Sequence, residues 1–497
     1  MQLKKNGFLN SEIRYLLKSD TLYNVLYSFK NRLKTIRVQF RNTKIISDFI
    51  EKFEYNTDNN TITLNFNDIT DFLTKLTTFY ETHGKLFSSI KLNNIKLVNN
   101  DAFANLSINE SKVRTIDKII IKGYDKFPRS FLKYRIKSKT KNTFNNKKLS
   151  LISRNLKTIP FVSEIKKPQV LFTKDSTLIY VYLKKKSMNY FNGFIGFSSK
   201  ETTKGLNFEG NLDIQLANIF NRGEKLNLLW KSNGSKNKNL KIGIETPYLF
   251  NQAFTPKLSF EIYSQDSTFI NLKSKLDIAY DFNFKNKFTI SAETEKSTFL
   301  LNTLLGNHSN FSNYFYGFSY RYKKKSELPM HSNLFYLNFN SLFGSRKTSE
   351  FSESQQKLQF TAHYTLLINS KNSLFLKNQS NVLISDNYLI NELFRIGGTN
   401  NIRGFQESSI LSSEYSIFNI EYQLYTNVTS YLYSVTDYAY VGNKTTSSKS
   451  NLFGLGLGYA FTTKAGLINL SYVLGKKDNL PFNFNNATIH IKLVNFF

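Results

Sequence analysis

From about residue 188 to the C-terminus, apolar and polar residues alternate with a period of two. The alternation is clear in residues 240–245, 314–322 and 453–459. Because successive side chains of a strand point to opposite faces, each segment predicts a strand with one apolar and one polar face. About 16 such segments of roughly ten to fifteen residues follow one another, which indicates a 16-stranded antiparallel transmembrane β-barrel over residues 188–497.

The length of these segments separates the barrel from a soluble all-β fold. Strands of a soluble sandwich or propeller also alternate, but they are most often about five or six residues long. The chain is rich in aromatic residues, with 46 Phe and 29 Tyr, and those near strand ends are typical of the aromatic girdles of membrane barrels. Full closure leaves no unpaired strand edge facing lipid. A soluble all-β fold remains the alternative.

Before residue 188 the pattern changes, and helical spacings interrupt the strands. Residues 69–79 carry apolar side chains at spacings of three and four, after a capping Asn67 or Asp68 and before Gly84. The order strand, helix, helix, strand, strand then recurs over about 75 residues. This predicts small α+β modules, which we place at 1–35 (truncated), 36–112 and 113–187.

Composition excludes several kinds of site. The chain has no cysteine, so disulfides, thiolate metal sites and cysteine nucleophiles are excluded. The five histidines are scattered, and we expect no metal site. The formal net charge of +31 would suit nucleic acid or anionic lipid head groups. Since the lysines are spread among asparagines along the whole chain, we expect no nucleic-acid partner.

Neither end of the chain carries a membrane helix or a recognisable leader. No stretch approaches the ~20 consecutive apolar residues that a spanning helix needs. Residues 1–7 lack the apolar run and small-residue cleavage site of a signal peptide. We therefore expect either a cytoplasmic protein or a chain whose signal peptide is missing.

One connection, residues 386–413, interrupts the alternation of the barrel segments. It is long and contains Gly397 and Gly398, followed by Ile402-Arg403-Gly404-Phe405. It is not a nucleotide-binding loop, because no Gly-Lys-Ser/Thr ends it. Taken alone, it fits a flexible surface loop with one incidental arginine.

The position of this motif, after about 11 predicted strands and before five more, resembles the outer-membrane assembly-factor barrels of the BamA/TamA type. In that family the loop after strand eleven folds into the lumen, and its Val/Ile-Arg-Gly-Phe/Tyr tip pairs with an acidic residue on strand thirteen. The resemblance implies that Arg403 pairs with Asp437, with Glu407 as the local alternative. Such a pair is physically reasonable, since a buried guanidinium needs a partner.

The resemblance covers most of the chain. The N-terminal modules look like periplasmic POTRA domains, and residues 245–250 resemble the proline-containing end of the family's fourth strand. Phe497 stands where the family's barrels end in a C-terminal recognition signal. Two departures are Asn495, where that signal usually has an aromatic residue, and residues 159–161, where members usually carry Gly-Xaa-Phe.

The resemblance implies an outer-membrane protein assembly or translocation factor. Its POTRA modules in the periplasm would bind unfolded outer-membrane or secreted clients by β-augmentation. The seam between the first and last barrel strands, about residues 188–199 and 487–497, would insert or translocate those clients. Outer-membrane lipid and periplasmic or inner-membrane accessory proteins would be further partners.

Other functions remain open at this point. With no Gly-x-Ser-x-Gly elbow, no paired carboxylates in a plausible cleft and no nucleotide loop, we expect neither an enzyme nor a cofactor. A two-partner-secretion-type transporter for one dedicated client is one alternative. A passive outer-membrane pore is another, although a lumen filled by the Arg403 loop should conduct poorly.

Overall fold

The computed structural model divides the chain into two compact units. The first consists of Met1–Asp125, Ser138–Leu156 and Glu164–Leu183, and the second of Lys126–Lys137, Lys157–Ser163 and Lys184–Phe497. Two short segments before residue 164 thus group with the C-terminal unit. The residues that the structure describes are 8, 11–19, 22–28, 32–98, 101–136, 142–199, 206–232, 237–265, 268–300, 309–325, 333–463 and 466–496.

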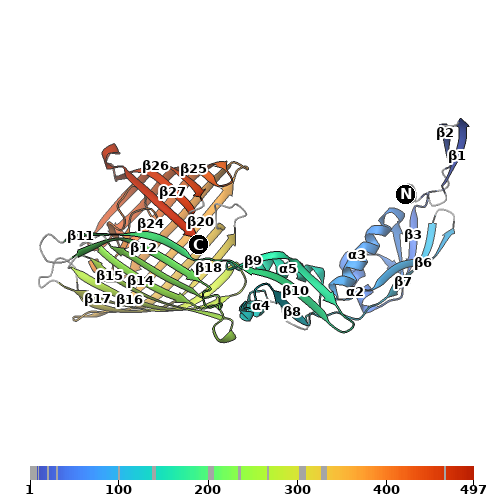
Figure 1. The fold of residues 1–497 in the computed structure, drawn as a ribbon, viewed down its shortest axis with the longest axis horizontal. Helices are drawn as coiled ribbons and strands as arrows, with labels where there is room; N and C mark the ends of the chain where they lie inside the picture. The colour runs from blue at the N-terminus through green and yellow to red at the C-terminus, as the bar shows by residue number, and fades with distance from the viewer. Residues whose placement is uncertain are drawn as a thin grey trace. The chain divides into compact units, whose positions relative to one another are not determined.

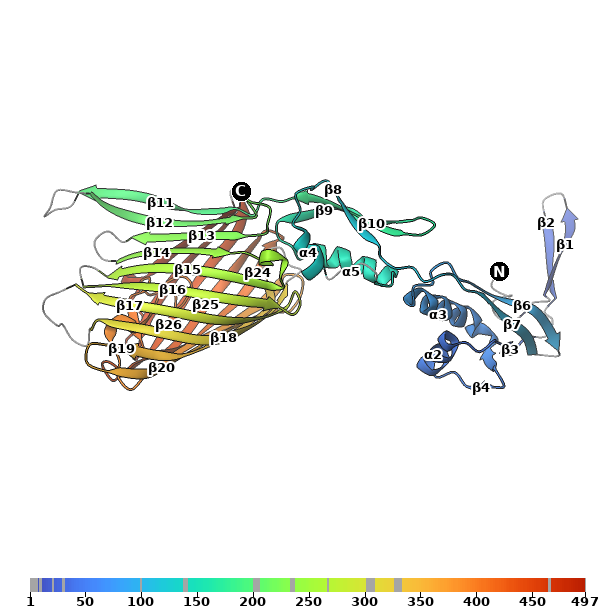
Figure 2. The same cartoon turned by 90° about the horizontal axis from the view of Figure 1, so that it is seen from below.

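The first unit contains a five-stranded sheet in the order β4-β5-β3-β7-β6, with two helices against it (Figure 2). The central pair β3 and β7 is parallel, and the other neighbours are antiparallel. The hairpin β4–β5 between the two helices was not predicted. The elements are β3 (Thr35–Gln39), α2 (Lys44–Phe53), β4 (Thr57–Asp58), β5 (Thr61–Asn65), η1 (Phe66–Asp68), α3 (Ile69–Thr82), β6 (Ser89–Val98) and β7 (Asp101–Asn109).

Period-two alternation decides which face of this sheet is covered. Ile36 and Val38 of β3 are buried, whereas Arg37 between them lies on the opposite face. The helices cover the apolar face, where Phe49 of α2 meets Phe72 of α3 with ring centroids 5.7 Å apart. Edge-to-face contacts of this kind add to the burial of apolar area.

A second sheet has the order β8-β10-β9. As in the first sheet, the strand that comes first along the chain, β8, is parallel to the one that comes last, β10. The arrangement repeats that of β3, β7 and β6, because the same order of strands and helices recurs in the sequence. Asn145 caps the second helix by accepting a hydrogen bond from the Lys148 amide at 2.8 Å. The elements are β8 (Lys118–Lys122), α4 (Arg129–Tyr134), α5 (Asn146–Leu156), β9 (Val162–Phe172) and β10 (Thr177–Lys185).

The predicted truncated module, residues 1–35, contains an antiparallel hairpin among its described residues. Its strands are β1 (Glu12–Ser19) and β2 (Leu22–Ser28). Among the described residues no helix is long and apolar enough to cross a membrane.

The second unit is a barrel of sixteen antiparallel strands, coloured green through red in Figure 1. This confirms the predicted sixteen-stranded antiparallel sheet. The strands are β11 (Tyr190–Ser199), β12 (Leu206–Ala217), β13 (Lys225–Ser232), β14 (Asn237–Glu245), β15 (Phe254–Gln265), β16 (Phe269–Asp281), β17 (Asn286–Phe299), β18 (Phe311–Lys325), β19 (Asn333–Lys347), β20 (Ser352–Leu367), β21 (Asn372–Ile384), β24 (Glu414–Asn427), β25 (Ser430–Asn443), β26 (Ser448–Thr463), β27 (Gly466–Lys477) and β28 (Thr488–Phe496).

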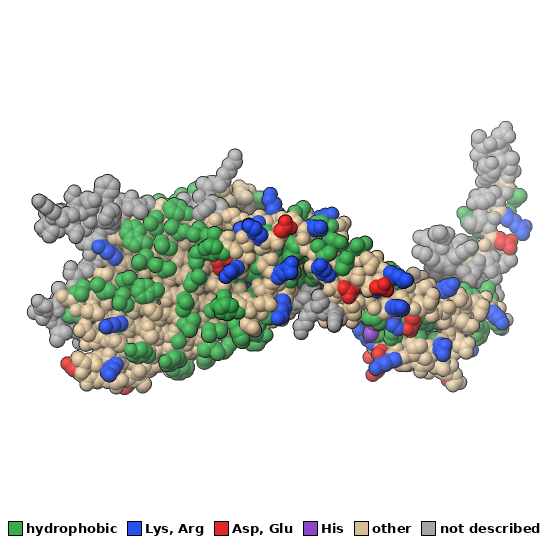
Figure 3. All heavy atoms as spheres, turned by 60° about the horizontal axis from the view of Figure 1, so that its bottom comes forward, with side chains coloured by type: hydrophobic (Ala, Val, Ile, Leu, Met, Phe, Trp, Pro, Cys, Tyr) green, Lys and Arg blue, Asp and Glu red, His purple; other side chains and the backbone are tan. Residues whose placement is uncertain are grey.

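The two faces of the barrel wall have opposite character. Hydrophobic side chains gather over the outer surface in Figure 3, and Tyr316 and Leu457 are 68% and 71% exposed. Alternate residues such as Glu293 and Ser297 are polar and buried. The wall therefore has an apolar exterior and a polar interior.

The seam of the barrel is its shortest strand pairing. Among the described residues, β11 and β28 pair only at Tyr190↔Phe496 and Phe191↔Asn495. Every other pair of neighbouring wall strands is in register over at least seven positions. Fewer ladder hydrogen bonds thus hold this seam than any other junction among the described strands.

Replacement of Phe49 by Ala tests the core of the first unit. The side chain is fully buried, so we expect a loss of about 3–5 kcal/mol in the stability of this unit. Hydrogen exchange of the full chain should become faster in α2, α3 and β3, while the barrel strands stay protected. Phe103→Ala, on the open face of the same sheet, is the matched control and should have a much smaller effect. Equal effects of the two changes would contradict the assigned core.

Candidate functional site

The connection between β21 and β24, the eleventh and twelfth wall strands, folds back into the barrel. It begins with a 3-10 turn η3 (Ile390–Glu392) and a small hairpin of β22 (Phe394–Ile396) and β23 (Ile410–Ser412). Residues 397–409 form the tip between these two strands. The predicted loop thus has strand pairing of its own at its base, which the sequence pattern did not indicate.

Arg403 at the tip makes the most extensive polar contacts of the loop. Its Nε and Nη2 donate to the two carboxylate oxygens of Asp437 on β25, at 2.8 and 2.6 Å. Its Nη1 donates to Glu421 on β24 at 2.6 Å, and its backbone amide donates to Asp437 at 3.0 Å. The guanidinium is therefore held by two carboxylates, one of them in a bidentate geometry.

These three charges lie away from solvent. The Arg403 side chain is 8% exposed, that of Asp437 is 0% and that of Glu421 is 13%. Burial alone lowers the pKa of Arg403, but the hydrogen bonds that it donates to Asp437 and the charge of Glu421 outweigh burial and raise that pKa above its ordinary value. The arginine stays charged, and removal of one partner leaves a buried charge uncompensated.

Glycines allow the tip backbone to approach the wall. Gly404 has φ +88°, and a Cβ on it would lie 2.7 Å from the amide nitrogen of Gly475 on β27. A Cβ on Gly475 or on Gly454 of β26 would meet the loop's carbonyl oxygens at 2.3 and 2.5 Å. Close packing of backbone on backbone therefore requires glycine on both sides of this contact.

The tip also carries an apolar anchor. Ile402 is completely buried in a cluster with wall residues that include Ile417, Ala439 and Leu452. Phe405 packs against the same cluster and is partly buried. Apolar burial beside the ion pair keeps water from the charged groups.

Further contacts connect the tip to strands on both sides of the seam. The Gly404 amide lies 3.2 Å from Nε2 of His490 on β28, and Lys377 of β21 donates to the Asn400 carbonyl at 2.8 Å. Glu407 pairs at 3.5 Å with Lys231 on β13, two strands from β11. The structure thus places Glu407 with Lys231 and away from Arg403, for which it was the alternative partner.

The base of the loop has a second arginine site. Arg346 on β19 is fully buried and pairs with Glu392 of the loop and Glu353 of β20. Gln355 adds a hydrogen bond to Glu392 at 3.0 Å. The base and the tip are therefore fixed by two separate buried ion-pair clusters.

A third arginine contact joins the loop to aromatic rings of the wall. The guanidinium of Arg395 lies 4.3 Å from the ring centroid of Tyr263 and 5.4 Å from that of Phe269. Cation–π contact at such distances is attractive, more so where water is excluded. Together the three arginines join the loop to the wall at β15–β16, β19–β20 and β24–β25.

The structure brings together most of the predicted site residues. Ile402, Arg403, Gly404 and Phe405 lie at the tip, Gly397 and Gly398 turn the chain into it with φ +116° and +93°, and Asp437 faces Arg403. Glu421, Arg346, Glu392, Gly475 and His490 were missed. Four of them are polar or glycine residues on inward strand positions, which nearly every strand has, and Glu392 lies in the turn η3 of the loop. Phe497 lies outside the described residues.

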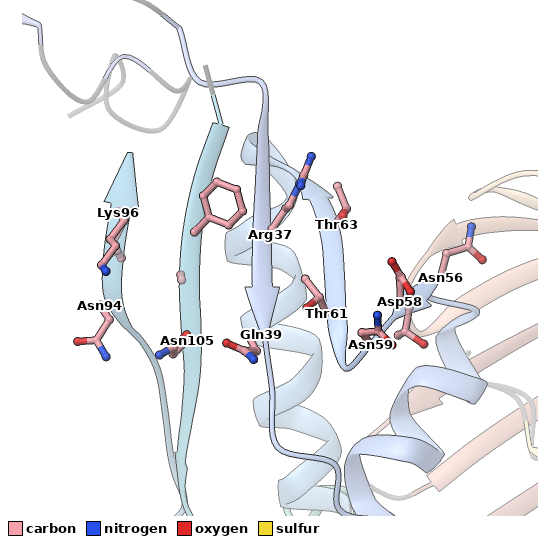
Figure 4. A pocket seen from close by; sticks show the side chains of 14 residues that line it. Arg37, Gln39, Asn56, Asp58, Asn59, Thr61, Thr63, Asn94, Lys96 and Asn105 are labelled. Carbon is pink, nitrogen blue, oxygen red and sulfur yellow. The ribbon is translucent and has the colours of Figure 1, made fainter. Parts of the chain in front are cut away.

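A separate hollow of about 1430 Å³ lies on the open face of the first unit's sheet (Figure 4). Its lining includes Arg37, Gln39, Thr61, Thr63 and Asn105, which project from β3, β5 and β7. These are the strand positions that alternate with the buried core. Within the residues that the structure describes, no group of three or more His, Cys, Asp or Glu side chains could hold a metal ion.

Solved structures with the same fold identify the architecture. BamA from Haemophilus ducreyi lacking POTRA domains 1–3 aligns with a TM-score of 0.56 at 12% identity, over 94% of this chain and 100% of that one. CdiB from Acinetobacter baumannii aligns with a TM-score of 0.55 at 15% identity, over 95% of this chain and 91% of that one. CdiB from Escherichia coli aligns with a TM-score of 0.55 at 13% identity, over 100% of this chain and 96% of that one. No family model and no curated protein matches the chain. The chain therefore has the fold of BamA and CdiB.

Replacement of Arg403 by Ala should destabilise the barrel by about 3–5 kcal/mol, because Asp437 and Glu421 lose their buried counter-charge. The readout is the temperature at which the barrel loses its heat-modifiable mobility on gels. Arg222→Ala, at an exposed position, is the matched control. The triple change Arg403→Met, Asp437→Asn and Glu421→Gln should recover part of the loss. An unchanged transition temperature in Arg403→Ala would contradict the assigned role.

Replacement of Gly404 by Ala should displace the tip from the wall, since both the positive φ and the 2.7 Å approach to Gly475 exclude a Cβ. Hydrogen exchange of residues 397–408 should become faster. Gly243→Ala on β14 is the matched control, because its nearest neighbour would be an ordinary 3.6 Å away. Equal exchange in both variants would show that the tip does not depend on this contact.

Proposed function

We propose that this protein is an outer-membrane assembly or translocation factor for unfolded protein clients. BamA is an insertase and CdiB a two-partner-secretion transporter, and the chain has their fold. An apolar exterior and a polar interior suit a barrel in lipid. We place the barrel in the bacterial outer membrane and the N-terminal modules, as POTRA-like domains, in the periplasm.

The observation that carries this proposal is the short seam between β11 and β28. The two paired positions among the described residues are fewer than at any other junction of the wall, which leaves backbone groups of these strands able to bond another strand. A client strand that pairs with β11 or β28 would satisfy those groups. The seam therefore acts as the insertion site.

The N-terminal modules contribute strand edges. Within the part of the chain that the structure describes, β6 and β9 each have a neighbouring strand on one side only. An extended client segment can add to such an edge through main-chain hydrogen bonds, with little dependence on its sequence. The modules would hold clients in an extended form before insertion.

The role of the Arg403 loop in this mechanism is conformational. Its tip contacts β28 on one side of the seam and β13 on the other, through His490 and Lys231. The loop occupies interior space beside the wall strands β24 to β27. It therefore disfavours a passive pore and supports the wall next to the insertion site.

A dedicated two-partner-secretion transporter is the second candidate. The alignments with CdiB are as good as the alignment with BamA, at TM-scores of 0.55 and 0.56. The two functions differ in the path of the client. A two-partner-secretion transporter would pass its client through the lumen, whereas an assembly factor would release it through the seam.

A cysteine pair across the seam separates these paths. The chain has no cysteine, so Phe191→Cys with Asn495→Cys introduces a single crosslink between β11 and β28. Oxidation should abolish client assembly, and reduction should restore it. Asn192→Cys with Asp213→Cys crosslinks β11 to β12 at a permanent junction and is the matched control. Full activity of the oxidised seam variant would contradict lateral insertion.

Depletion of the protein in its host then defines the clients. A broad loss of outer-membrane barrels, with unfolded precursors in the periplasm, is expected of a general assembly factor. Loss of one or a few secreted or surface proteins would identify the dedicated transporter. An unchanged outer-membrane and secreted proteome would contradict both.

A further inference from the structure

A second polar site lies at the end of the barrel where β13, β15 and β17 begin. Strand ends, turns and helix α4 surround a pocket of about 330 Å³ there, and every residue that lines it belongs to the second unit. Seven of its lining side chains are Lys or Arg, and only two, Glu245 and Asp281, are carboxylates. The pocket therefore carries a large excess of positive charge.

Helix α4 is attached firmly enough to form one wall of this pocket. Tyr248, in the turn between β14 and β15, stacks on Tyr134 with ring centroids 5.3 Å apart and contacts the edge of Phe131 at 4.9 Å. The Tyr134 hydroxyl donates to the Asn251 carbonyl at 2.6 Å. These contacts bring Arg135, at the end of α4, to the pocket.

The two carboxylates of the pocket form ion pairs with only two of its cations, Arg135 and Lys287. Asp281 lies 3.8 Å from Arg135 and 3.7 Å from Lys287, and Glu245 lies 3.8 Å from Lys287. No ion pair within 4 Å joins the remaining strand cations to any residue that the structure describes; these are Lys225, Arg321, Lys323 and Lys325.

The arrangement of the cations is unfavourable in the absence of an anion. Arg321 of β18 lies directly opposite Lys287 of β17 in the sheet register, and like charges in that position repel. The Nε of Arg321 is buried and has no hydrogen-bond partner among the described residues. The Lys323 amide donates to the Lys285 carbonyl at 2.9 Å, so that the 283–286 turn fixes the backbone from which the Lys323 side chain extends.

We propose that this pocket binds a compact phosphate-bearing anion. Phosphate offers several charged oxygens to a guanidinium fork and to lysine ammonium groups, which matches an Arg321 and Lys323 pair without carboxylate partners. A volume of about 330 Å³ suits a phosphorylated headgroup or a free pyrophosphate, whereas an extended acidic peptide needs a longer groove. The bound anion would join Arg135 of α4 to Arg321 of the wall and stabilise the docked helix.

Binding is tested with the full chain in a zwitterionic detergent and with pyrophosphate as the probe. Calorimetry should give saturable binding at one site per chain. The double change Arg321→Gln with Lys323→Gln should weaken binding by about tenfold or more, because two charge-assisted contacts are lost. Lys371→Gln with Lys449→Gln removes the same charge elsewhere on the barrel and should have no effect.

Lys285→Gln and Lys371→Gln are a second matched pair of variants, and only the change at Lys285, in the pocket, should weaken pyrophosphate binding. The turns 283–286 and 369–372 share the sequence Asn-x-Lys-Asn, and in both the first Asn side chain accepts from the backbone amides two and three residues on, at 2.8–2.9 Å. Only the first turn lines the pocket. Unchanged heat-modifiability of all variants controls for folding.

Hydrogen exchange of residues 126–136 identifies the source of the phosphate. Added protection by soluble pyrophosphate in detergent supports a free phosphate compound, and protection only in phosphatidylglycerol nanodiscs supports a lipid headgroup. Absence of protection by both probes, or equal weakening in the Lys371 and Lys449 control, would overturn the proposal. None of these readouts requires client assembly, so the result is independent of the proposed function.

Discussion

The structure of the second unit depends on a backbone hydrogen-bond ladder that runs through sixteen antiparallel strands. Because side chains alternate across this ladder, one sequence pattern produces an apolar exterior and a polar interior together. Inside this wall the charge of buried Arg403 is compensated by carboxylates such as that of Asp437. The weak point of the ladder, at β11 and β28, is also the place where we propose that a client strand enters.

The interior loop contacts the strands of the wall unevenly. Its three arginine contacts lie at the tip, in the hairpin and at the base, and they attach to three different pairs of wall strands. The tip rests on β24 to β28, whereas no ion pair among the described residues joins it to β11 or β12. Among the described residues the loop thus contacts one side of the seam directly, at β28, and the other side only through β13.

Much of the fold could be predicted because it depends on local periodicity. Residues 314–322 alternate strictly, and they lie within β18; the helix predicted over 69–79 lies within α3. The hairpin β4–β5 was missed because its strands are short and polar on one face. In the site, Arg403 and Asp437 were found through a resemblance, whereas Glu421 looks like any other inward polar residue of a strand.

The sequence by itself determined the strand number, the two faces of the wall and the place of the loop, since each follows from spacing along the chain. Tertiary structure alone decided that Arg403 has two carboxylates, that Gly404 lies against Gly475, and that Arg321 faces Lys287. These contacts join residues far apart in sequence, and strand register sets them. Register is a property of the closed sheet, and no single segment contains the information that fixes it.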